Sequence, residues 1–415
     1  MFCDVAIIGA GPAGLSAAIA AKKEGAQQVL LIERDESVGG ILQQCIHPGF
    51  GLSYFQSELT GPEYAGRLAD KAFEDGVEVL LNSMVLEILP EEKKILCINE
   101  KYGIVEVCAG SIILAMGCRE KTRASLQIPG TRPSGIYTAG TAQRLVNRQN
   151  AMVGKRVVIL GSGDIGMIMA RRMSLEGAQV LAVVEIMDYL AGLTRNKVQC
   201  LDDFSIPLKL CHTVTRIVGN KRIEGVYIAQ VDEHKKPMPE TEEFIACDTL
   251  LLSVGLMPEN ELTRKAEISV SPVTNGPVVN QYMQTMADAV FACGNVLHVN
   301  DLVDHVTVES MRAGKYAAQY AMGKLPSGAA AYSAIPGCNV RYLCPQMLVP
   351  EKNNTVTLFF RVSMPQRGVT ISAKSGGSVL ASKKAILVNP GEMCSIELPT
   401  DGICGDVTVD VVKEA

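Results

Sequence analysis

The stretch Val5-Ala6-Ile7-Ile8-Gly9-Ala10-Gly11-Pro12-Ala13-Gly14 decides the fold of this chain. A helical run follows it to Gly25, and an apolar segment at 29–33 then ends in Glu33. The arrangement recurs in Val157-Val158-Ile159-Leu160-Gly161-Ser162-Gly163-Asp164-Ile165-Gly166, followed by a helical run and an apolar segment that ends in Glu185. Both copies predict a strand, a glycine turn, a helix and a second strand with a carboxylate at its end.

Each part of this pattern has a task in binding a dinucleotide. The first glycine allows a sharp turn, the second lets the backbone approach a pyrophosphate, and the third lets the helix pack on the strand. The helix N-terminus offers N–H groups to the phosphates, and the carboxylate accepts the hydroxyls of an adenosine ribose. Because the pattern occurs twice in its full setting, we predict two dinucleotide sites.

The composition limits the class of protein. The 415 residues are enough for two or three domains, and 47% hydrophobic residues with 5% aromatics suit aliphatic parallel sheets. Lys and Arg (39) nearly balance Asp and Glu (44) without a basic stripe, so no nucleic-acid partner is expected. Apolar runs are short and Met1 lies close to the first strand, so neither a membrane span nor a cleavable signal is expected, and the expected location is cytoplasmic.

The 13 cysteines are expected to be reduced thiols in that compartment. They form no C-x-x-C pair, and neither Cys338 with Cys344 nor Cys394 with Cys404 has the spacing of an iron–sulfur or zinc site. Most of them, including Cys97, fall in apolar strand-like runs and are predicted to be small buried hydrophobes.

Further elements surround the two signatures. After a helix near 62–75, strands are predicted at 77–81, 84–90, 93–99 and 103–108, the last three as a meander laid over a parallel sheet. A separate run at 111–117 is predicted to return to that sheet, and 249–255 is its counterpart in the second half. The buried strand at 289–295 and a helix at about 306–321 are predicted to rejoin the first domain.

The pattern changes from about residue 333. Alternation of apolar and polar residues there has the period of half-buried antiparallel strands, at 355–362, 369–373, 385–388, 396–398 and 407–411. The pairs Gly376-Gly377 and Pro390-Gly391 are turn signals between them. We predict a small all-β domain without a catalytic constellation.

These ordered motifs resemble the pyridine nucleotide-disulfide oxidoreductase superfamily, flavoproteins with two dinucleotide-binding domains, and the resemblance covers residues 1–325. It implies an FAD domain that is split by an inserted NAD domain. The implied FAD contacts are Gly9, Gly11, Pro12, Ala13, Gly14, Glu33, Arg34, Gly40, Ala115, Gly117, Gly294 and Asn295. The implied NAD(H) contacts are Gly161, Gly163, Asp164, Ile165, Gly166, Glu185 and Gly255.

Two positions depart from the superfamily pattern. Asn295 stands where an Asp is usual, so a ribityl hydroxyl would meet an amide without charge assistance, which bears on the affinity for FAD rather than on its identity. The loop after Gly40 has one cysteine, Cys45, where the disulfide reductases of the superfamily have two. A packing role for Cys45 near the flavin and a redox role through a sulfenic or mixed-disulfide state are both open, and packing is favoured.

His47, His298 and His305 are the histidines expected near the flavin. Each is either a proton shuttle for reduced flavin or a hydrogen-bonded structural residue, and the structural role is favoured. The spacing of His298, Asp301, Asp304 and His305 suits no standard site, so no metal is expected. The resemblance implies that the following helix points its N-terminus at the flavin pyrimidine.

Residues 39–52 and 161–172 are similar to flavoproteins encoded beside glycerol-3-phosphate dehydrogenases and to the NADH-oxidising subunits of dye-linked amino-acid dehydrogenases and opine oxidases. This similarity implies an FAD-dependent enzyme that transfers hydride between NADH and FAD and passes electrons onward. The acceptor would be a dehydrogenase-type partner subunit, docked through the C-terminal domain, that oxidises glycerol 3-phosphate or an amino acid. A homo-oligomer is also expected.

The sequence therefore predicts an α/β protein with two Rossmann-like domains and a small C-terminal all-β domain. The predicted boundaries are 1–120 and 277–330 for the FAD domain, 150–270 for the NAD domain and 333–415 for the β domain. Two other functions stay open. One is a self-contained NADH-dependent thiol, disulfide or peroxide reductase with Cys45 and His47 as candidate catalytic residues, and the other is a non-catalytic NADH-sensing flavoprotein.

Overall fold

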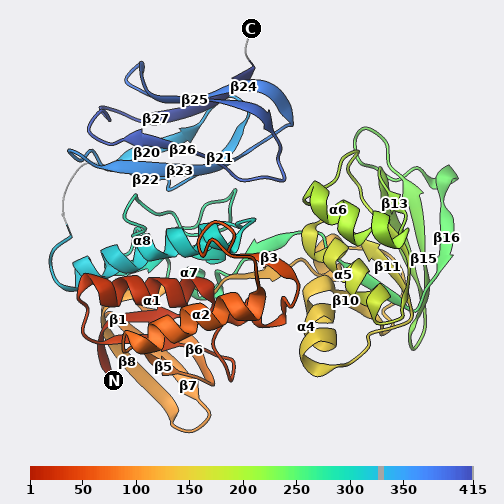
Figure 1. The fold of residues 1–415 in the computed structure, drawn as a ribbon, viewed down its shortest axis with the longest axis horizontal. Helices are drawn as coiled ribbons and strands as arrows, with labels where there is room; N and C mark the ends of the chain where they lie inside the picture. The colour runs from red at the N-terminus through yellow and green to blue at the C-terminus, as the bar shows by residue number, and fades with distance from the viewer. Residues whose placement is uncertain (326–330, 414–415) are drawn as a thin grey trace. The chain divides into compact units, whose positions relative to one another are not determined.

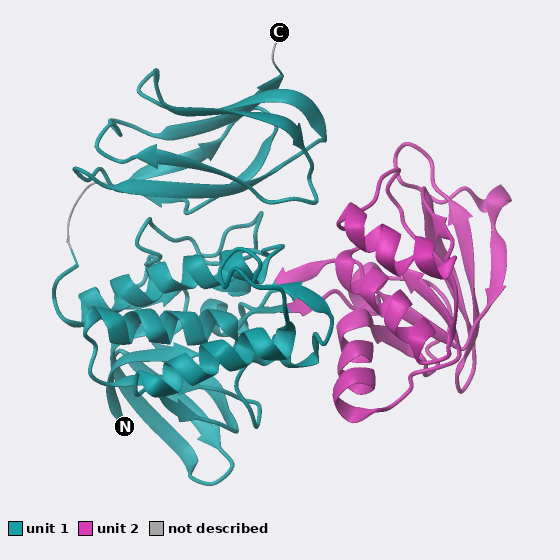
Figure 2. Ribbon diagram, viewed as in Figure 1, with its two compact units in different colours: residues 1–118, 258–415 teal, residues 119–257 magenta. Residues whose placement is uncertain are grey.

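The computed structural model describes residues 1–325 and 331–413 and forms two compact units, residues 1–118 with 258–415 and residues 119–257 (Figure 2). Each unit contains a parallel sheet that begins with one of the two glycine signatures. The C-terminal β region belongs to the first unit. The three-domain boundaries remain predictions, and the predicted end of the FAD domain, at 330, lies outside the described residues.

The parallel sheet of the first unit consists of aliphatic strands. Its order is β5-β2-β1-β8, and β19 pairs with the other side of β8. The bounds are β1 (Phe2–Ile8), β2 (Val29–Ile32), β5 (Glu78–Leu80), β8 (Gly103–Leu114) and β19 (Val290–Ala292). The pairing of β19 with β8 confirms that the chain rejoins this sheet after the second unit.

The meander differs from the prediction. Strand β7 (Lys94–Asn99) runs antiparallel to β8, β6 (Ser83–Leu89) runs antiparallel to β7, and both extend the same sheet. The prediction of separate strands at 103–108 and 111–117 was wrong, because β8 is one strand that pairs first with β7 and then with β1. Gly110 lies inside it, and a Cβ there would be 2.7 Å from the Asp4 carbonyl oxygen, so this glycine marks a close backbone approach rather than a turn.

Three helices lie side by side in the first unit, namely α1 (Pro12–Glu24), α2 (Gly61–Glu74) and α8 (Val303–Ala321) (Figure 1). Helix α1 begins with Pro12 and ends at Gly25 in the left-handed conformation, and α2 begins with a capping box between Thr60 and Glu63. Helix α8 starts three residues before its predicted start. It packs tightly on α1, since a Cβ at Gly314 would lie 2.0 Å from the Ala17 carbonyl oxygen.

The second unit repeats this plan. Its parallel sheet has the order β10-β17-β11-β12-β13, and α5 (Asp164–Leu175) follows the glycine turn. The strands are β10 (Ile136–Thr138), β11 (Arg156–Leu160), β12 (Gln179–Val184), β13 (Leu208–Lys209) and β17 (Thr249–Leu252). The other elements are α4 (Ala139–Gln149), α6 (Thr194–Cys200) and an antiparallel sheet of β14 (His212–Gly219), β15 (Ile223–Gln230) and β16 (Glu243–Ala246).

The C-terminal region has two sheets that share one apolar core. One has the order β22-β20-β27-β24-β25 and the other the order β21-β23-β26. The bounds are β20 (Tyr332–Pro336), β21 (Val340–Cys344), β22 (Met347–Leu348), β23 (Thr355–Val362), β24 (Gln366–Ser375), β25 (Ser378–Val388), β26 (Cys394–Pro399) and β27 (Val407–Lys413). The strands that alternation predicted are present, whereas the sequence did not identify β20 to β22.

The remaining elements are short. They are η1 (Gly40–Gln44), β3 (Pro48–Phe50), β4 (Leu59–Thr60), β9 (Cys118–Glu120), α3 (Arg123–Leu126), η2 (Asp202–Phe204), η3 (Pro239–Thr241), β18 (Leu256–Pro258), α7 (Glu261–Lys265) and η4 (Gly294–Val296). Within residues 1–325 and 331–413, no helix is both long enough and apolar enough to cross a bilayer.

Candidate nucleotide-binding sites

The first glycine signature contains a turn that only glycine can make. Gly9 follows β1 with φ +103°, and a Cβ there would lie 2.5 Å from the Ala115 carbonyl oxygen. A Cβ at Gly14 would lie 1.8 Å from the Gly9 carbonyl oxygen. A side chain at either position would therefore displace backbone, and the helix could not start where it does.

Gly11 has a different environment. It caps α1 with φ −74°, and a Cβ there would meet only the Gly40 Cα, at 3.9 Å. No side chain caps this helix. A helix N-terminus without a side-chain cap, with no close contact at the Cβ position of Gly11, fits a pyrophosphate that approaches the backbone closely.

Glu33 is oriented at the end of β2 by backbone donors. Its Oε2 accepts from the Ala10 N–H at 2.7 Å and its Oε1 from the Asp35 N–H at 2.9 Å. The side chain is buried, while the adjacent Arg34 is exposed. Each carboxylate oxygen has a further lone pair. The backbone thus fixes the Glu33 carboxylate and leaves it capacity to accept further hydrogen bonds, as a ribose contact requires.

The second signature has the same geometry. Gly161 has φ +99°, and a Cβ there would lie 2.0 Å from the Ser253 carbonyl oxygen, whereas a Cβ at Gly163 would lie 3.4 Å from the Ser253 Oγ. Glu185 Oε2 accepts from the Ser162 N–H at 2.8 Å, and Oε1 accepts from the Met187 N–H at 2.9 Å. Both units therefore place a backbone-bound carboxylate at the same point of the turn.

Three other residues predicted to contact NAD(H) have varied surroundings. The Asp164 carboxylate accepts from the Leu193 N–H at 2.8 Å and from Asn196 Nδ2 at 2.6 Å, so its side chain orders the loop before α6. Ile165 packs partly against the apolar core of its unit. Gly255 has φ +99° and no atom within 4 Å of the position of a Cβ.

The late turn, Gly294–Asn295, lies close to the glycine turn that precedes α1. Gly294 has φ +71°, and a Cβ there would lie 2.7 Å from the Ala13 Cβ at the start of α1. Asn295 donates from Nδ2 to the Cys118 sulfur at 3.7 Å and accepts the Asn300 N–H at 2.9 Å. Gly117 has φ +74° with open space beside it. The structure thus brings residues of three distant segments to the N-terminus of α1.

Cys45 lies after η1, where its Sγ donates to the Ile41 carbonyl oxygen at 3.3 Å. Burial raises the pKa of this thiol to about 12. Because the thiolate is the reactive form, a neutral thiol at pH 7 favours packing over redox chemistry. His47 contacts the Pro48 carbonyl oxygen through Nδ1 at 3.0 Å and the ring of Phe50.

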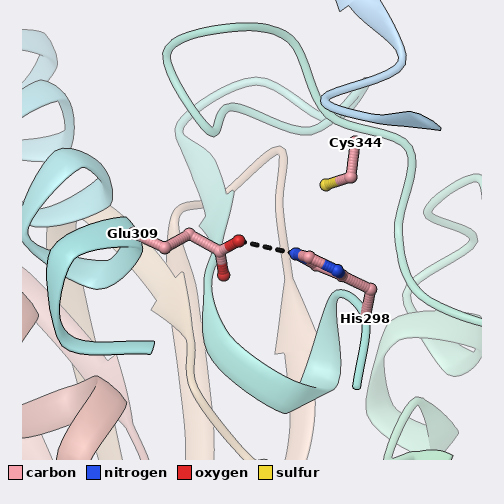
Figure 3. A group of neighbouring side chains, drawn as sticks. All are labelled: His298, Glu309 and Cys344. Carbon is pink, nitrogen blue, oxygen red and sulfur yellow. Dashed lines mark hydrogen bonds and ion pairs between the residues drawn. The ribbon is translucent and has the colours of Figure 1, made fainter. Parts of the chain in front are cut away.

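The four side chains considered as a metal site, those of His298, Asp301, Asp304 and His305, each contact different partners. Asp301 pairs with Arg361, and Asp304 Oδ2 accepts the Ser53 N–H at 2.8 Å. His298 Nε2 instead contacts Glu309 Oε2 at 2.6 Å, and both side chains are almost fully buried (Figure 3). His305 packs near the ring of Phe359.

Sequence reasoning missed Glu309 and Cys344, which lie with His298 in one buried group (Figure 3). Glu309 lies on α8 and Cys344 at the end of β21. The Cys344 sulfur lies within 4.8 Å of the ligand atoms of the other two residues. No short spacing signals this group, because its members come from the loop after η4, from α8 and from β21.

The two signatures each have the features that a dinucleotide site requires, as predicted for FAD and for a nicotinamide dinucleotide. Each combines a glycine turn, a helix N-terminus with space for a pyrophosphate and an oriented carboxylate. The FAD residues meet this requirement within the first unit alone, and the NAD(H) residues within the second. The arrangement suits redox chemistry carried by cofactors.

Comparison with known proteins identifies relatives of this chain. The glutamate synthase [NADPH] small chain of Halomonas elongata is 25% identical over 335 residues, which cover 75% of this chain and 66% of that protein. An opine oxidase subunit of Agrobacterium tumefaciens is 23% identical over 281 residues, which cover 64% of this chain and 54% of that protein. The chain thus matches less than two thirds of the length of these relatives.

A solved structure shows the same fold. Thioredoxin reductase of T. acidophilum aligns with a TM-score of 0.63 at 23% identity, over 77% of this chain and 98% of that one. The predicted α/β class with two Rossmann-like regions is confirmed. Residues 3–318 match the family described as pyridine nucleotide-disulphide oxidoreductase. The chain therefore belongs to this family of FAD- and NAD(P)H-dependent oxidoreductases.

Proposed function

We propose that this protein is the flavoprotein subunit of a dehydrogenase complex, in which hydride passes between NADH and FAD and electrons then pass to a partner subunit. The observation that carries the proposal is the repeated cradle, a glycine turn with a backbone-bound carboxylate in each unit. Two relatives support the subunit role, since one is the small chain of glutamate synthase and the other is a subunit of opine oxidase. The partner oxidises glycerol 3-phosphate or an amino acid and docks on the C-terminal β region.

The residues of the chain bind and orient the cofactors. Gly11 and the N-terminus of α1 receive the FAD pyrophosphate, and Glu33 accepts the ribose hydroxyls. Gly163 and Glu185 do the same for NADH. When bound, FAD supplies the hydride acceptor.

The direct test is spectroscopic. Purified protein should contain one non-covalent FAD, and anaerobic NADH should bleach its visible absorbance, which an artificial dye should then restore. Expression with the neighbouring genes should yield a complex with a dehydrogenase-type subunit. Protein that takes up no FAD after refolding would exclude the flavoprotein assignment, whereas full activity on an isolated substrate without any partner would exclude only the subunit role.

A first prediction concerns coenzyme choice. The parent protein should prefer NADH to NADPH, because the 2′-phosphate of NADPH would meet the Glu185 carboxylate. Glu185→Gln removes this repulsion. The ratio of the NADH rate to the NADPH rate should then fall about tenfold, which corresponds to a difference of about 1.4 kcal/mol between the two coenzymes. The ratio of NADH to NADPH reduction rates in stopped-flow measures it.

The matched control is Asp188→Asn. Asp188 is a more exposed neighbouring carboxylate, paired with Lys235 at 3.8 Å, and its loss should leave the ratio nearly unchanged. Equal rates with both coenzymes in the parent protein, or an equal change in both variants, would contradict the role of Glu185.

A second prediction separates this function from a thiol reductase that uses Cys45. Cys45→Ser should retain most of the NADH-driven reduction of a dye, because a thiol with a pKa of about 12 is neutral at working pH. Its thiolate appears only as the pH rises toward that value, so alkylation of the native parent at pH 8 should be slow. Loss of disulfide or peroxide turnover in Cys45→Ser, starting from a parent that reduces them efficiently, would favour the reductase instead.

A further inference from the structure

Glu309 links Gly294, a predicted FAD contact, to His298, a buried histidine outside the cofactor signatures. Its Oε1 accepts the Gly294 N–H at 2.8 Å, and its Oε2 contacts His298 Nε2 at 2.6 Å (Figure 3). Glu309 is 2% exposed and His298 1% exposed. One carboxylate on α8 therefore holds the first residue of η4 and the histidine that follows this turn.

The turn held in this way has little freedom. Gly294 is in the left-handed region, and a Cβ there would also come within 3.3 Å of Val306 Cγ1 on α8. The same Cβ would lie 2.7 Å from the Ala13 Cβ in the first turn of α1. Any shift of the Gly294 amide would thus move the late turn relative to the pyrophosphate cradle.

The charges in this group compensate one another. Burial lowers the pKa of His298, whereas Cys344 and Glu309 raise it, and the net pKa lies well above the ordinary value. Burial raises the pKa of the Cys344 thiol, and the Glu309 oxygen 2.6 Å from His298 Nε2 favours the charged form of the imidazole. Cys344 Sγ points toward the pair (Figure 3). A buried ion pair of this kind is no strong source of stability, since its desolvation offsets its attraction.

We propose that Glu309 and His298 are positioning residues that hold the Gly294–Asn295 turn in its flavin-binding conformation. The inference rests on the proposed placement of FAD at this turn. Glu309 fixes the Gly294 amide, and the protonated imidazole fixes the Glu309 carboxylate and balances its charge. The pair acts on FAD through the backbone, without touching the reacting atoms.

Two variants test the proposal. Glu309→Gln keeps the shape and one acceptor but removes the charge, and His298→Phe/Glu309→Leu replaces the pair by apolar groups and leaves the Gly294 N–H without an acceptor. The FAD dissociation constant of the apoprotein should rise at least about tenfold in the double variant and less in Glu309→Gln. Hydrogen exchange at the Gly294 amide should also accelerate, more in the double variant than in Glu309→Gln.

Glu351→Gln is the matched control, because Glu351 accepts from Tyr282 and Asn354 and does not contact the turn. Its FAD affinity should equal that of the parent. Variants that melt at lower temperature but bind FAD as the parent does, with unchanged exchange at Gly294, would show that the pair is merely structural. A parent that binds no FAD would instead overturn the proposed function.

Discussion

A Gly11→Val protein is expected to fold and to be colourless. A Cβ at this position meets only the Gly40 Cα, at 3.9 Å, and φ −74° suits any residue. The Val side chain occupies the space through which a pyrophosphate would approach the N-terminus of α1. The affinity for FAD should fall at least about 100-fold, or by roughly 3 kcal/mol. The flavin content of purified protein and titration of the apoprotein with FAD measure this loss.

Gly66→Val provides the control for this change. Gly66 lies in α2, and a Cβ there meets no atom within 4 Å, so this variant should remain yellow. Circular dichroism establishes that both variants are folded, and Gly11→Ala is a smaller substitution at the same position. A folded Gly11→Val protein with the FAD content of the parent would refute the placement of the pyrophosphate.

The corresponding change in the second unit should separate the two cofactors. Gly163 caps α5 with φ −65°, and a Cβ there lies 3.4 Å from the Ser253 Oγ, so Gly163→Val should fold. It should retain FAD and lose reduction by NADH, with a rate at fixed coenzyme that falls at least about 100-fold. Anaerobic stopped-flow absorbance follows the reduction.

Dithionite serves as the control, because it reduces the flavin without the nicotinamide site. It should bleach Gly163→Val and the parent alike. A variant that still reacts with NADH at the rate of the parent would show that NADH does not bind at the second signature. Loss of FAD from Gly163→Val would contradict the assignment of one cofactor to each unit.

The sequence predicted those parts of the fold that depend on neighbouring residues along the chain, such as glycine turns and alternating strands. The positions of Gly9, Gly14 and Gly161 follow from steric limits on a strand-to-helix turn, and Glu33 and Glu185 follow from the length of the unit. The strand at 355–362 was visible because alternation has a clear period. These features need no knowledge of distant contacts.

The missed features depend on tertiary contacts. Gly110 looks like a break between strands, and only the approach of Asp4 and Ala321 shows why β8 continues through it. The three-residue strand β10 is too short to leave a periodic signal. His298 was a candidate, but its partners Glu309 and Cys344 come from α8 and β21, and no sequence interval joins them.

Glu185, the proposed acceptor for the ribose of NADH, limits which substitutions can change the coenzyme preference. Glu185 accepts the N–H and Oγ of Ser162 as well as the Met187 N–H. A residue that accommodates a 2′-phosphate but accepts no hydrogen bond would leave these donors without that acceptor. The cost is about 1–3 kcal/mol for each of the two buried Ser162 donors. A typical domain has a free energy of unfolding of only about 5–15 kcal/mol. A single substitution that changes the coenzyme would therefore lower the stability of the fold by a substantial fraction, even where it raises the activity with NADPH. Adaptation to NADPH therefore requires concerted substitutions at Ser162 and around Met187.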